Sequence, residues 1–428
     1  MTQDTRRDFV KSSAGLTLLS QTARGANDRI SLAVIGTGTM GSANLDAASE
    51  QKGVAITALC DVFQPNLERA VAQAIRKGHQ PRQVKDFREI LADRSIDAVC
   101  ISTPDHWHPY ITVEACKAGK DVYVEKPTGV AVDEGFVMVD AARKYQRVVQ
   151  AGTWQRSGAH FQKARDIIQS GELGKIANCR TWIYNNSPSA GIGAPPNTTP
   201  PPGLDWDLWL GPTAARDFNP NRFGVYPKAY SYFRFFWDYA GGQLTDSGVH
   251  MIDIVHMALK EAMPQSVSAL GGKYWFTDDT ETPDTMQATF EYPGALVTWE
   301  HRSHNTENSR ARLMGATFYG SNATLYVDRT ELRITPEKNS TVKPFEMKRQ
   351  ADPHPLHWAN FIDCVRTRKR PNSDIETCAR SSAACILGNL SLQLKMRLDW
   401  DEAKRTTVQE QARPHLRREY RAPWKLEV

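Results

Sequence analysis

The chain has 428 residues and a formal net charge of +5, and its lysines and arginines are interspersed with aspartates and glutamates. This length predicts two or more domains, and the modest charge argues against nucleic acid as the main partner. No apolar run is long enough to cross a membrane, so membrane insertion is not expected. The seven scattered cysteines form no Cys-x-x-Cys pair, which predicts buried free thiols rather than disulfides or a thiolate metal site.

Residues 1–27 are set apart from the folded domains as an export signal and linker. Thr5–Lys11 resembles a twin-arginine export signal, and a short apolar run, Ala14–Leu19, follows it. A disordered basic tail is the alternative, because no clean Ala-x-Ala cleavage site precedes Asp28. If the signal is used, the protein is exported to the periplasm; otherwise it stays in the cytoplasm.

The segment 30–61 predicts a dinucleotide site. Ile30–Ile35 is a nearly all-apolar run of the kind that buried parallel strands use. The glycines that follow have the spacing Gly-x-Gly-x-x-Gly, and Asp61 ends the next predicted strand, where a carboxylate binds an adenosine ribose. No arginine adjoins Asp61 in the sequence, so NAD is favoured over NADP. The residues expected to bind the cofactor here are Gly36, Thr37, Gly38, Thr39, Met40, Gly41 and Asp61.

Strands and helices continue to alternate up to Ala151, which predicts a doubly wound parallel sheet in a domain of residues 28–151. Helices are expected at Leu67–Arg76, Phe87–Leu91, Ile111–Ala118 and Asp133–Tyr145, and strands at Ala98–Ser102, Val122–Val124 and Val148–Ala151. Ligands of such sheets bind beyond the carboxyl ends of the strands. Further cofactor contacts are therefore expected from Thr103, Pro104, His106, His108, Glu125 and Lys126.

Residues 152–428 predict a second, α+β domain on a largely antiparallel sheet, because several of its strand-like runs alternate polar and apolar residues. Strands are expected at Ile176–Tyr184, Ser266–Trp275, Thr285–Glu291, Ala295–His301, Thr317–Tyr319, Thr324–Val327 and Leu332–Thr335, and helices at Phe161–Ser170, Asp246–Leu259, Leu356–Thr367 and Thr377–Leu394. The proline-rich stretch Gly193–Gly203 predicts a surface loop. The tail after Pro414 is expected to be solvated or to wrap a partner.

Lys126 and the segment Asp246–Asp253 carry the strongest candidates for chemistry. Lys126 follows a parallel strand and directly precedes a proline, toward the nicotinamide end of a bound dinucleotide; a surface lysine at a turn is the alternative. If a helix begins near Asp246, then Asp246, His250 and Asp253 share one face. A carboxylate and an imidazole suit proton abstraction from an alcohol. The alternatives are a helix N-cap for Asp246 and a hydrogen-bonded core histidine for His250.

Two further features have competing interpretations. The histidine pairs His106 and His108, His301 and His304, and His354 and His357 match no standard zinc spacing, so no metal is expected. Residues 206–238 are dense in aromatic side chains with interleaved polar ones, which suits the apolar faces and hydroxyl rim of a sugar. The alternative for these rings is an aromatic core under a long loop.

The motifs in order are Gly36–Gly41, Asp61, Thr103-Pro104-x-x-x-His108, Glu125-Lys126-Pro127 and Asp246-x-x-x-His250. Together they resemble the glucose–fructose oxidoreductase / inositol dehydrogenase family (Gfo/Idh/MocA). The resemblance implies a Rossmann domain followed by a domain with a large open sheet, which is often a homo-oligomer interface. It also implies NAD(P), sugar or cyclitol substrates, and Lys126, Asp246 and His250 as the catalytic set. The Asp-His-Trp-His loop resembles exported members, mostly known as predicted dehydrogenases.

The expected reaction is hydride transfer between a sugar carbon and the nicotinamide. His250 would take the hydroxyl proton, Lys126 would stabilise the charge on the same oxygen, and Asp246 would hold a substrate hydroxyl and bias the imidazole. Substrate contacts are also expected from Trp154, Gln155 and Arg156, with Gln155 touching the cofactor as well.

An exported enzyme meets little free NAD, which favours a tightly bound cofactor and a closed redox cycle. A sugar–sugar oxidoreductase is one such cycle. An NAD-dependent glycosidase that oxidises C3 transiently, with a glycoside as substrate, is the second. A non-catalytic sugar-binding protein on the same fold is a third interpretation.

Overall fold

The computed structural model describes residues 29–185, 191–223, 231–260, 263–306 and 312–428. The predicted export signal and part of the aromatic segment lie outside the described residues. The seven cysteines are all buried and free, as the sequence predicted.

The first sheet has six strands in the order β3-β2-β1-β4-β5-β6, and all its pairings are parallel. The strands are β1 (Ile30–Ile35), β2 (Val54–Cys60), β3 (Arg82–Val84), β4 (Ala98–Ile101), β5 (Asp121–Val124) and β6 (Val149–Ala151). The helices between them are α2 (Thr39–Ser49), α3 (Gln64–Arg76), α4 (Phe87–Ala92), α5 (His108–Lys117) and α6 (Val132–Lys144). This is the predicted doubly wound fold, with only β3 missing from the sequence prediction.

A helix from far along the chain completes the packing of this sheet. In α11 (Pro353–Thr367), Trp358 and Phe361 are fully buried in the same core as Leu32 and Leu45. The indole of Trp358 stacks on the Tyr123 ring of β5, with ring centroids 4.2 Å apart. The nucleotide-binding half therefore depends on residues from the C-terminal half for its core.

The second sheet has ten strands in the order β14-β13-β12-β11-β7-β10-β9-β8-β15-β16. Its strands are β7 (Ile176–Tyr184), β8 (Ser266–Gly272), β9 (Thr285–Tyr292), β10 (Ala295–Arg302), β11 (Met314–Gly320), β12 (Ala323–Val327), β13 (Glu331–Pro336), β14 (Phe345–Lys348), β15 (Leu398–Asp401) and β16 (Thr406–Thr407). Every pairing is antiparallel except that of β7 with β10.

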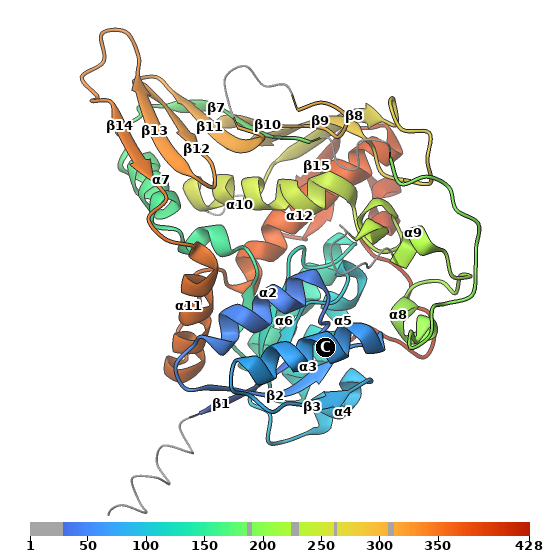
Figure 1. Cartoon of the computed structure of the whole chain (residues 1–428). Coiled ribbons are helices and arrows are strands. Elements are labelled where there is room, and N and C mark those ends of the chain that lie inside the picture. The colour runs from blue at the N-terminus through green and yellow to red at the C-terminus, as the bar shows by residue number, and fades with distance from the viewer. Residues whose placement is uncertain (1–28, 186–190, 224–230, 261–262, 307–311) are drawn as a thin grey trace, which may run out of the picture.

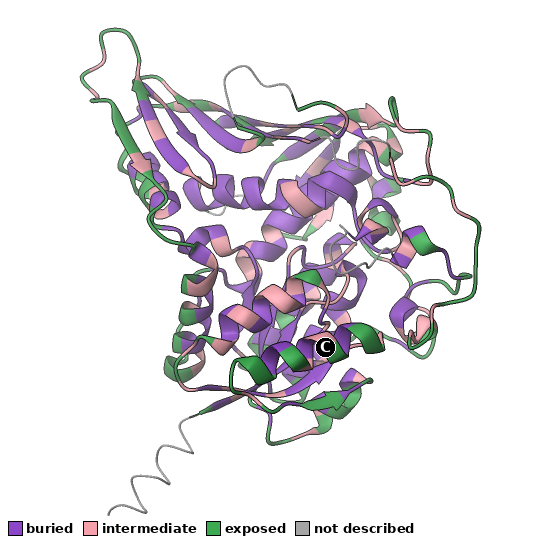
Figure 2. Cartoon of the chain, viewed as in Figure 1, coloured by how far each residue is buried: buried purple, intermediate pink, exposed green. Residues whose placement is uncertain are grey.

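Helices fill the space between the two sheets. These are α7 (Ala159–Ser170), α10 (Val249–Ala258) and α12 (Ile375–Leu394), of which α10 and α12 lie under the large sheet (Figure 1). Both are largely buried, whereas the loop through residues 193–203 is largely exposed, as predicted (Figure 2). Two short helices, α8 (Trp206–Leu210) and α9 (Pro220–Phe223), flank the first sheet.

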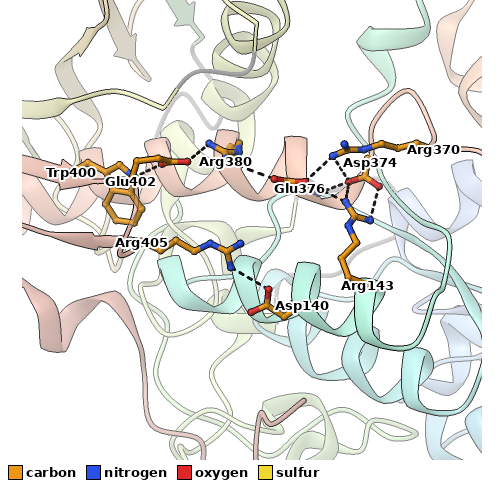
Figure 3. Close-up of polar contacts among 9 residues, drawn as sticks. All are labelled: Asp140, Arg143, Arg370, Asp374, Glu376, Arg380, Trp400, Glu402 and Arg405. Atoms are coloured by element: carbon orange, nitrogen blue, oxygen red, sulfur yellow. Dashed lines mark hydrogen bonds and ion pairs between the residues drawn. The ribbon is translucent and has the colours of Figure 1, made fainter.

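Ion pairs join α12 to α6 across the two halves (Figure 3). Arg143 of α6 pairs with Asp374, the N-cap residue of α12. Arg405 reaches Asp140 of α6 with 3.2 Å between Nη1 and Oδ1. Most of these groups are half-exposed, so each pair contributes little by itself; the buried α12–α6 contact carries more.

Two expectations differ from the structure. The predicted helix from Asp246 begins earlier and in another form, because Leu244–Gly248 is a π-helical turn that leads into α10. The tail after Pro414 is not simply solvated: Trp424 packs among Phe87, Trp107 and Tyr110, and Arg418 Nε donates to Glu134 at 2.8 Å. The tail buries its aromatic groups on the nucleotide-binding half, and the basic composition of the tail did not indicate this packing.

Candidate active site

The turn from β1 to α2 has the geometry that its three glycines predicted. Gly36 has a φ of +84°, and a Cβ there would lie 2.7 Å from the backbone of Ser102. A Cβ at Gly41 would lie 2.0 Å from the Gly36 carbonyl oxygen. By contrast, a Cβ at Gly38 would meet nothing within 4 Å. Gly36 and Gly41 thus allow close packing, while Gly38 leaves open space where a pyrophosphate can approach the helix N-terminus.

Asp61 is held in place beside this turn. One carboxylate oxygen accepts from Thr37 N at 2.7 Å and from Thr37 Oγ1 at 2.9 Å, and the other accepts from Phe63 N at 2.9 Å. Burial raises the pKa of Asp61, although these hydrogen bonds oppose the shift. No arginine adjoins Asp61 in the sequence, but Arg69 of α3 comes near it in the fold: its guanidinium donates to the Thr37 carbonyl at 2.8 Å, and its charge lowers the pKa of Asp61.

A cleft runs along the carboxyl edge of the parallel sheet. Its lining includes Gly38 and Asp61 at one part and Lys126 and Arg234 at another. Among the other predicted cofactor residues, Gly36, Thr39, Met40, Thr103, Pro104, His108 and Glu125 also line it. Open space at Gly38 together with a fixed acid at Asp61 fits a dinucleotide with its ribose at Asp61.

Lys126 and Asp246 meet across the two halves of the chain. The Lys126 ammonium donates to Asp246 Oδ1 at 2.7 Å and to the Asp246 carbonyl at 2.9 Å. Arg234 Nε donates to the same Oδ1 at 3.2 Å. The side chains of Lys126 and Asp246 are only 12% and 14% exposed. Asp246 is therefore the acceptor in a shielded ion cluster inside the π-helical turn, and not the N-cap that the sequence also allowed.

His250 lies in the first turn of α10 and is 6% exposed. Its Nδ1 is buried without a hydrogen-bond partner among the described residues, so it is not the hydrogen-bonded core histidine of the alternative. Burial, reinforced by the charges of Arg329 and Lys126, lowers the pKa of His250 well below its usual value, while Asp246 opposes this. The imidazole is therefore neutral near pH 7 and can accept a proton.

Asp105 is an acid that the sequence analysis did not select. It lines the cleft and is buried. Burial raises its pKa to about 7, with Arg234 and Lys126 opposing and Asp246 adding to the shift. A carboxyl group with this pKa exchanges protons near neutral pH. The loop sequence gives no sign of this burial, which depends on the covering segment around Arg234.

Arg329, in the turn between β12 and β13, is a second residue that the sequence analysis missed. Its guanidinium lies over the Trp154 indole, 4.7 Å from the ring centroid. Its Nε donates to Gln155 Oε1 at 3.3 Å. The Trp154 ring lies 5.9 Å from that of His250. The structure thus places Trp154 beside His250 and links both Trp154 and Gln155 to the cation of Arg329, while their roles as substrate contacts stay predictions.

Arg156 lies apart from this group. Its guanidinium is 4% exposed and donates to both carboxylate oxygens of Asp253, at 2.7 and 2.9 Å. Ser381 Oγ of α12 also donates to Asp253, at 2.9 Å. The buried Arg156–Asp253 pair ties the turn at Trp154–Ser157 to α10, and Ser381 adds α12, so the position of Arg156 favours a structural role over the predicted substrate contact. Asp253 likewise does not join Asp246 and His250 in one cluster.

The histidines of the loop Thr103–His108 contact backbone carbonyls of the protein. His106 is fully buried and its Nε2 lies 3.0 Å from the Trp209 carbonyl, which Trp107 Nε1 also contacts. The ring nitrogens of His108 lie 2.8 and 2.7 Å from the carbonyls of Thr103 and Pro127. These two histidines therefore fix the loop and the covering segment around Trp209.

Glu125 is oriented by a residue absent from the sequence prediction. Asn44 of α2 donates to Glu125 Oε1 at 2.9 Å, and its own carbonyl oxygen accepts from Trp358 Nε1 at 3.0 Å. His354 Nε2 lies 2.8 Å from the same Asn44 oxygen. Asn44 thus couples the edge of the cofactor cleft to α11.

Of the two interpretations of the aromatic segment, the aromatic core is confirmed in part, and the sugar platform stays a prediction. Trp209, Leu210, Phe218, Phe223, Phe233, Phe236, Tyr239 and Ala240 form a buried core of their own. Three of them, Trp209, Phe223 and Phe233, also line the cleft.

The described residues contain no group of three or more His, Cys, Asp or Glu side chains placed to hold a metal ion. No described helix is long and apolar enough to span a membrane.

The fold and cleft define a two-domain protein with a dinucleotide-binding Rossmann half. Two family models match the chain: "Oxidoreductase family, NAD-binding Rossmann fold" over residues 30–153, and "Oxidoreductase family, C-terminal alpha/beta domain" over residues 181–426. The chain belongs to this Gfo/Idh/MocA oxidoreductase family, and its cofactor is NAD.

Curated relatives match over about a third of this chain. A "Glycosyl hydrolase family 109 protein" of Shewanella putrefaciens is 31% identical over 154 residues, which is 35% of this chain and 34% of that protein. The chain thus spans about a third of the length of this relative.

Solved structures match over nearly the whole fold. One is the WlbA dehydrogenase from Bordetella pertussis in complex with NADH and UDP-GlcNAcA, with a TM-score of 0.64 and 20% identity over 87% of this chain and 99% of that one. Another is levoglucosan dehydrogenase in complex with NADH and levoglucosan, with a TM-score of 0.66 and 17% identity over the same shares. At these identities the likeness shows the fold alone.

Proposed function

We propose that this protein transfers a hydride between a CH–OH group of a sugar or cyclitol and NAD. The observation that carries the proposal is the shielded Lys126–Asp246 pair at the edge of the NAD-binding cleft, with a neutral His250 nearby whose Nδ1 lacks a partner. The structural similarity to dehydrogenases crystallised with NADH and sugar ligands supports it.

Bound NAD would accept or supply the hydride at the sugar carbon. The Lys126 ammonium would hydrogen-bond the hydroxyl oxygen, which stabilises negative charge on that oxygen as its proton leaves. His250 would take the proton, because its imidazole is neutral and buried. Its lowered pKa makes it a weak base, so charge stabilisation by Lys126 has to lower the pKa of the substrate hydroxyl. Asp246 would fix the Lys126 ammonium and hold a neighbouring hydroxyl.

The predicted export signal makes a closed redox cycle the favoured form of this activity. A twin-arginine signal carries folded proteins, so NAD could cross the membrane already bound. A sugar–sugar oxidoreductase would then oxidise one substrate and reduce another on the same cofactor.

The partial similarity to a glycosyl hydrolase family 109 protein favours a second candidate. In that case the same residues would oxidise C3 of a glycoside transiently, and water would replace the leaving group before re-reduction. Release of nitrophenol from 4-nitrophenyl glycosides, without net NADH, would separate this candidate from a dehydrogenase.

Homo-oligomers through the large sheet are also part of the proposal. Leu296 of β10 and Tyr319 of β11 are 42% and 41% exposed and both lie opposite Asn178 of β7. Leu270 of β8 is 81% exposed. Apolar groups on one sheet face suit a second copy, and light scattering of the purified protein would give its mass in solution.

The test of the catalytic roles is the substitution Lys126→Ala, with Lys117→Ala on the surface of α5 as the matched control. We expect Lys126→Ala to lower kcat by about 100-fold or more, while the affinity for NAD stays close to that of the wild type. Lys117→Ala should change neither. Full turnover by Lys126→Ala with intact NAD binding would overturn the assignment.

A further inference from the structure

Arg329 is presented to the site by a firmly built turn. Asp328 Oδ1 accepts from Thr330 N at 2.6 Å and from Glu331 N at 2.8 Å, and Oδ2 accepts from the Tyr326 hydroxyl at 2.8 Å. Asp328 is 1% exposed. Because the β12–β13 turn is closed on itself in this way, the Arg329 guanidinium has a fixed place beside Trp154.

This guanidinium lacks a carboxylate of its own. Within the described residues Arg329 forms no ion pair within 4 Å, and its one hydrogen bond there runs from Nε to Gln155 Oε1. The carboxylate that raises the pKa of Arg329 is that of Asp246, which already forms ion pairs with Lys126 and Arg234. Burial lowers the pKa of Arg329. A half-buried cation without a paired anion is costly, which indicates that an anion from outside the chain completes the site.

Gln155 supplies a second donor without an acceptor. It is 1% exposed, and its Nε2 is buried without a hydrogen-bond partner among the described residues. The bond from Arg329 Nε to Oε1 fixes the amide orientation, so Nε2 can only donate. A buried donor of this kind needs an acceptor oxygen.

The charged groups around His250 also carry a surplus of positive charge. Lys126, Arg234 and Arg329 are cations, His250 is neutral, and Asp246 is the one carboxylate with which two of those cations pair. Asp105 is only partly ionised near neutral pH, since its pKa is about 7. The site thus has an excess of positive charge where the proposed reaction places the substrate.

We infer that Arg329, helped by Gln155, binds a carboxylate of the substrate, so that the substrate is an acidic sugar such as a uronic or aldonic acid. The inference rests on the proposed function for the position of the substrate beside His250. The planar fork of an arginine matches the two oxygens of a carboxylate, and the Trp154 indole beneath it offers an apolar face to the sugar ring.

The experiment measures binding to NAD-loaded protein by calorimetry at constant ionic strength. The probes are D-glucuronate and D-gluconate, their neutral counterpart D-glucose, and D-glucose 6-phosphate. We expect at least one of the acids to bind ten-fold or more tightly than glucose. Arg329→Gln should remove this preference, whereas Arg333→Gln on the neighbouring strand β13 should retain it.

Equal binding of the acids and glucose by the wild type, or an unchanged preference in Arg329→Gln, would overturn the inference, as would a preference for the phosphate alone. Arg329→Lys keeps the charge without the fork and should bind the acids with intermediate affinity. If Arg329→Gln fails to fold, the inference is tested by comparing the binding of the acids with that of glucose in the wild type and in Arg329→Lys. Acid binding without any reduction of NAD would leave the inference standing and contradict the proposed function instead.

Discussion

Asp105 gives the site a proton-binding group that titrates in the physiological range. Its pKa is about 7 in the folded protein against an ordinary value of 3.8. The folded state binds this proton more tightly than the unfolded state does. The proton therefore makes its whole contribution to the free energy of unfolding below pH 4, and this contribution is lost as the pH rises toward 7. The shift corresponds to at most about 4 kcal/mol.

The substitution Asp105→Asn removes this titration while keeping the shape of the protonated carboxyl group. We expect its melting temperature to fall less than that of the wild type between pH 5 and pH 8, and to exceed it at pH 8. The exposed Asp166→Asn is the control, and it should follow the wild type. Identical pH profiles of the melting temperature for Asp105→Asn and the wild type would show that the pKa of Asp105 is not raised.

At this scale the sequence predicted the residues that belong to compact motifs. Lys126 and Asp246 were predicted as partners in chemistry, and the structure joins them at 2.7 Å, although their catalytic roles stay predictions. Arg329 and the pairing of Arg234 with Asp246 could not be predicted, because both depend on the tertiary packing of segments far apart in the sequence. Arg156 shows the reverse case: its neighbours face the site, but its own guanidinium turns inward to Asp253.

The turn from β1 to α2 allows a test at the level of an element. In Gly36→Ala the new Cβ would collide with the Ser102 backbone, and the φ of +84° would be strained. In Gly38→Ala the Cβ has open space and the φ is −65°. We expect Gly36→Ala to lower the melting temperature clearly, and Gly38→Ala to leave it nearly unchanged while weakening NAD binding about ten-fold.

Thermal melting and NAD titration on the same two proteins check this contrast. Each variant serves as the control for the other, since both add one methyl group to the same turn. Unchanged NAD affinity in Gly38→Ala would mean that the pyrophosphate does not approach this glycine.

Elements with a strong apolar period were predictable, and so was the edge strand β6, whereas three other short edge strands were not. The strand predicted at Ile176–Tyr184 matches β7 residue for residue. The edge strands β3, β14 and β16 have four residues or fewer, so they show no period that a pattern could reveal. The π-helical turn at Asp246 was also not predictable, because its form depends on the packing of Leu244 and Gly248 against Gly388 and Trp299.

On the scale of the whole molecule, the C-terminal stretch holds the two halves together. Helix α11 enters the core of the first sheet, α12 packs on α6, and Trp424 of the tail closes on Trp107. The composition of these segments predicted helices and a tail, but their partners lie some 200 residues or more away in sequence. If the predicted export signal is used, a fold of this kind is expected to be complete before export, with NAD already in its cleft.

The twin-arginine interpretation of Thr5–Lys11 predicts a clear effect in cells. Changing Arg6 and Arg7 to lysine should retain the protein in the cytoplasm, and the wild type should reach the periplasmic fraction. The change Lys11→Arg, outside the arginine pair, is the control. Equal distribution of the double variant and the wild type would contradict the export signal.

The most direct test of the account is the reduction of NAD⁺ on the purified protein, followed at 340 nm after addition of neutral sugars, acidic sugars and cyclitols in turn. We predict that at least one compound, and among the acids first, reduces the cofactor, and that Lys126→Ala with bound NAD⁺ does not respond. Protein that holds NAD⁺ and shows no reduction with any of these compounds would contradict the proposed sugar dehydrogenase and leave either the glycosidase or a sugar-binding protein on this fold.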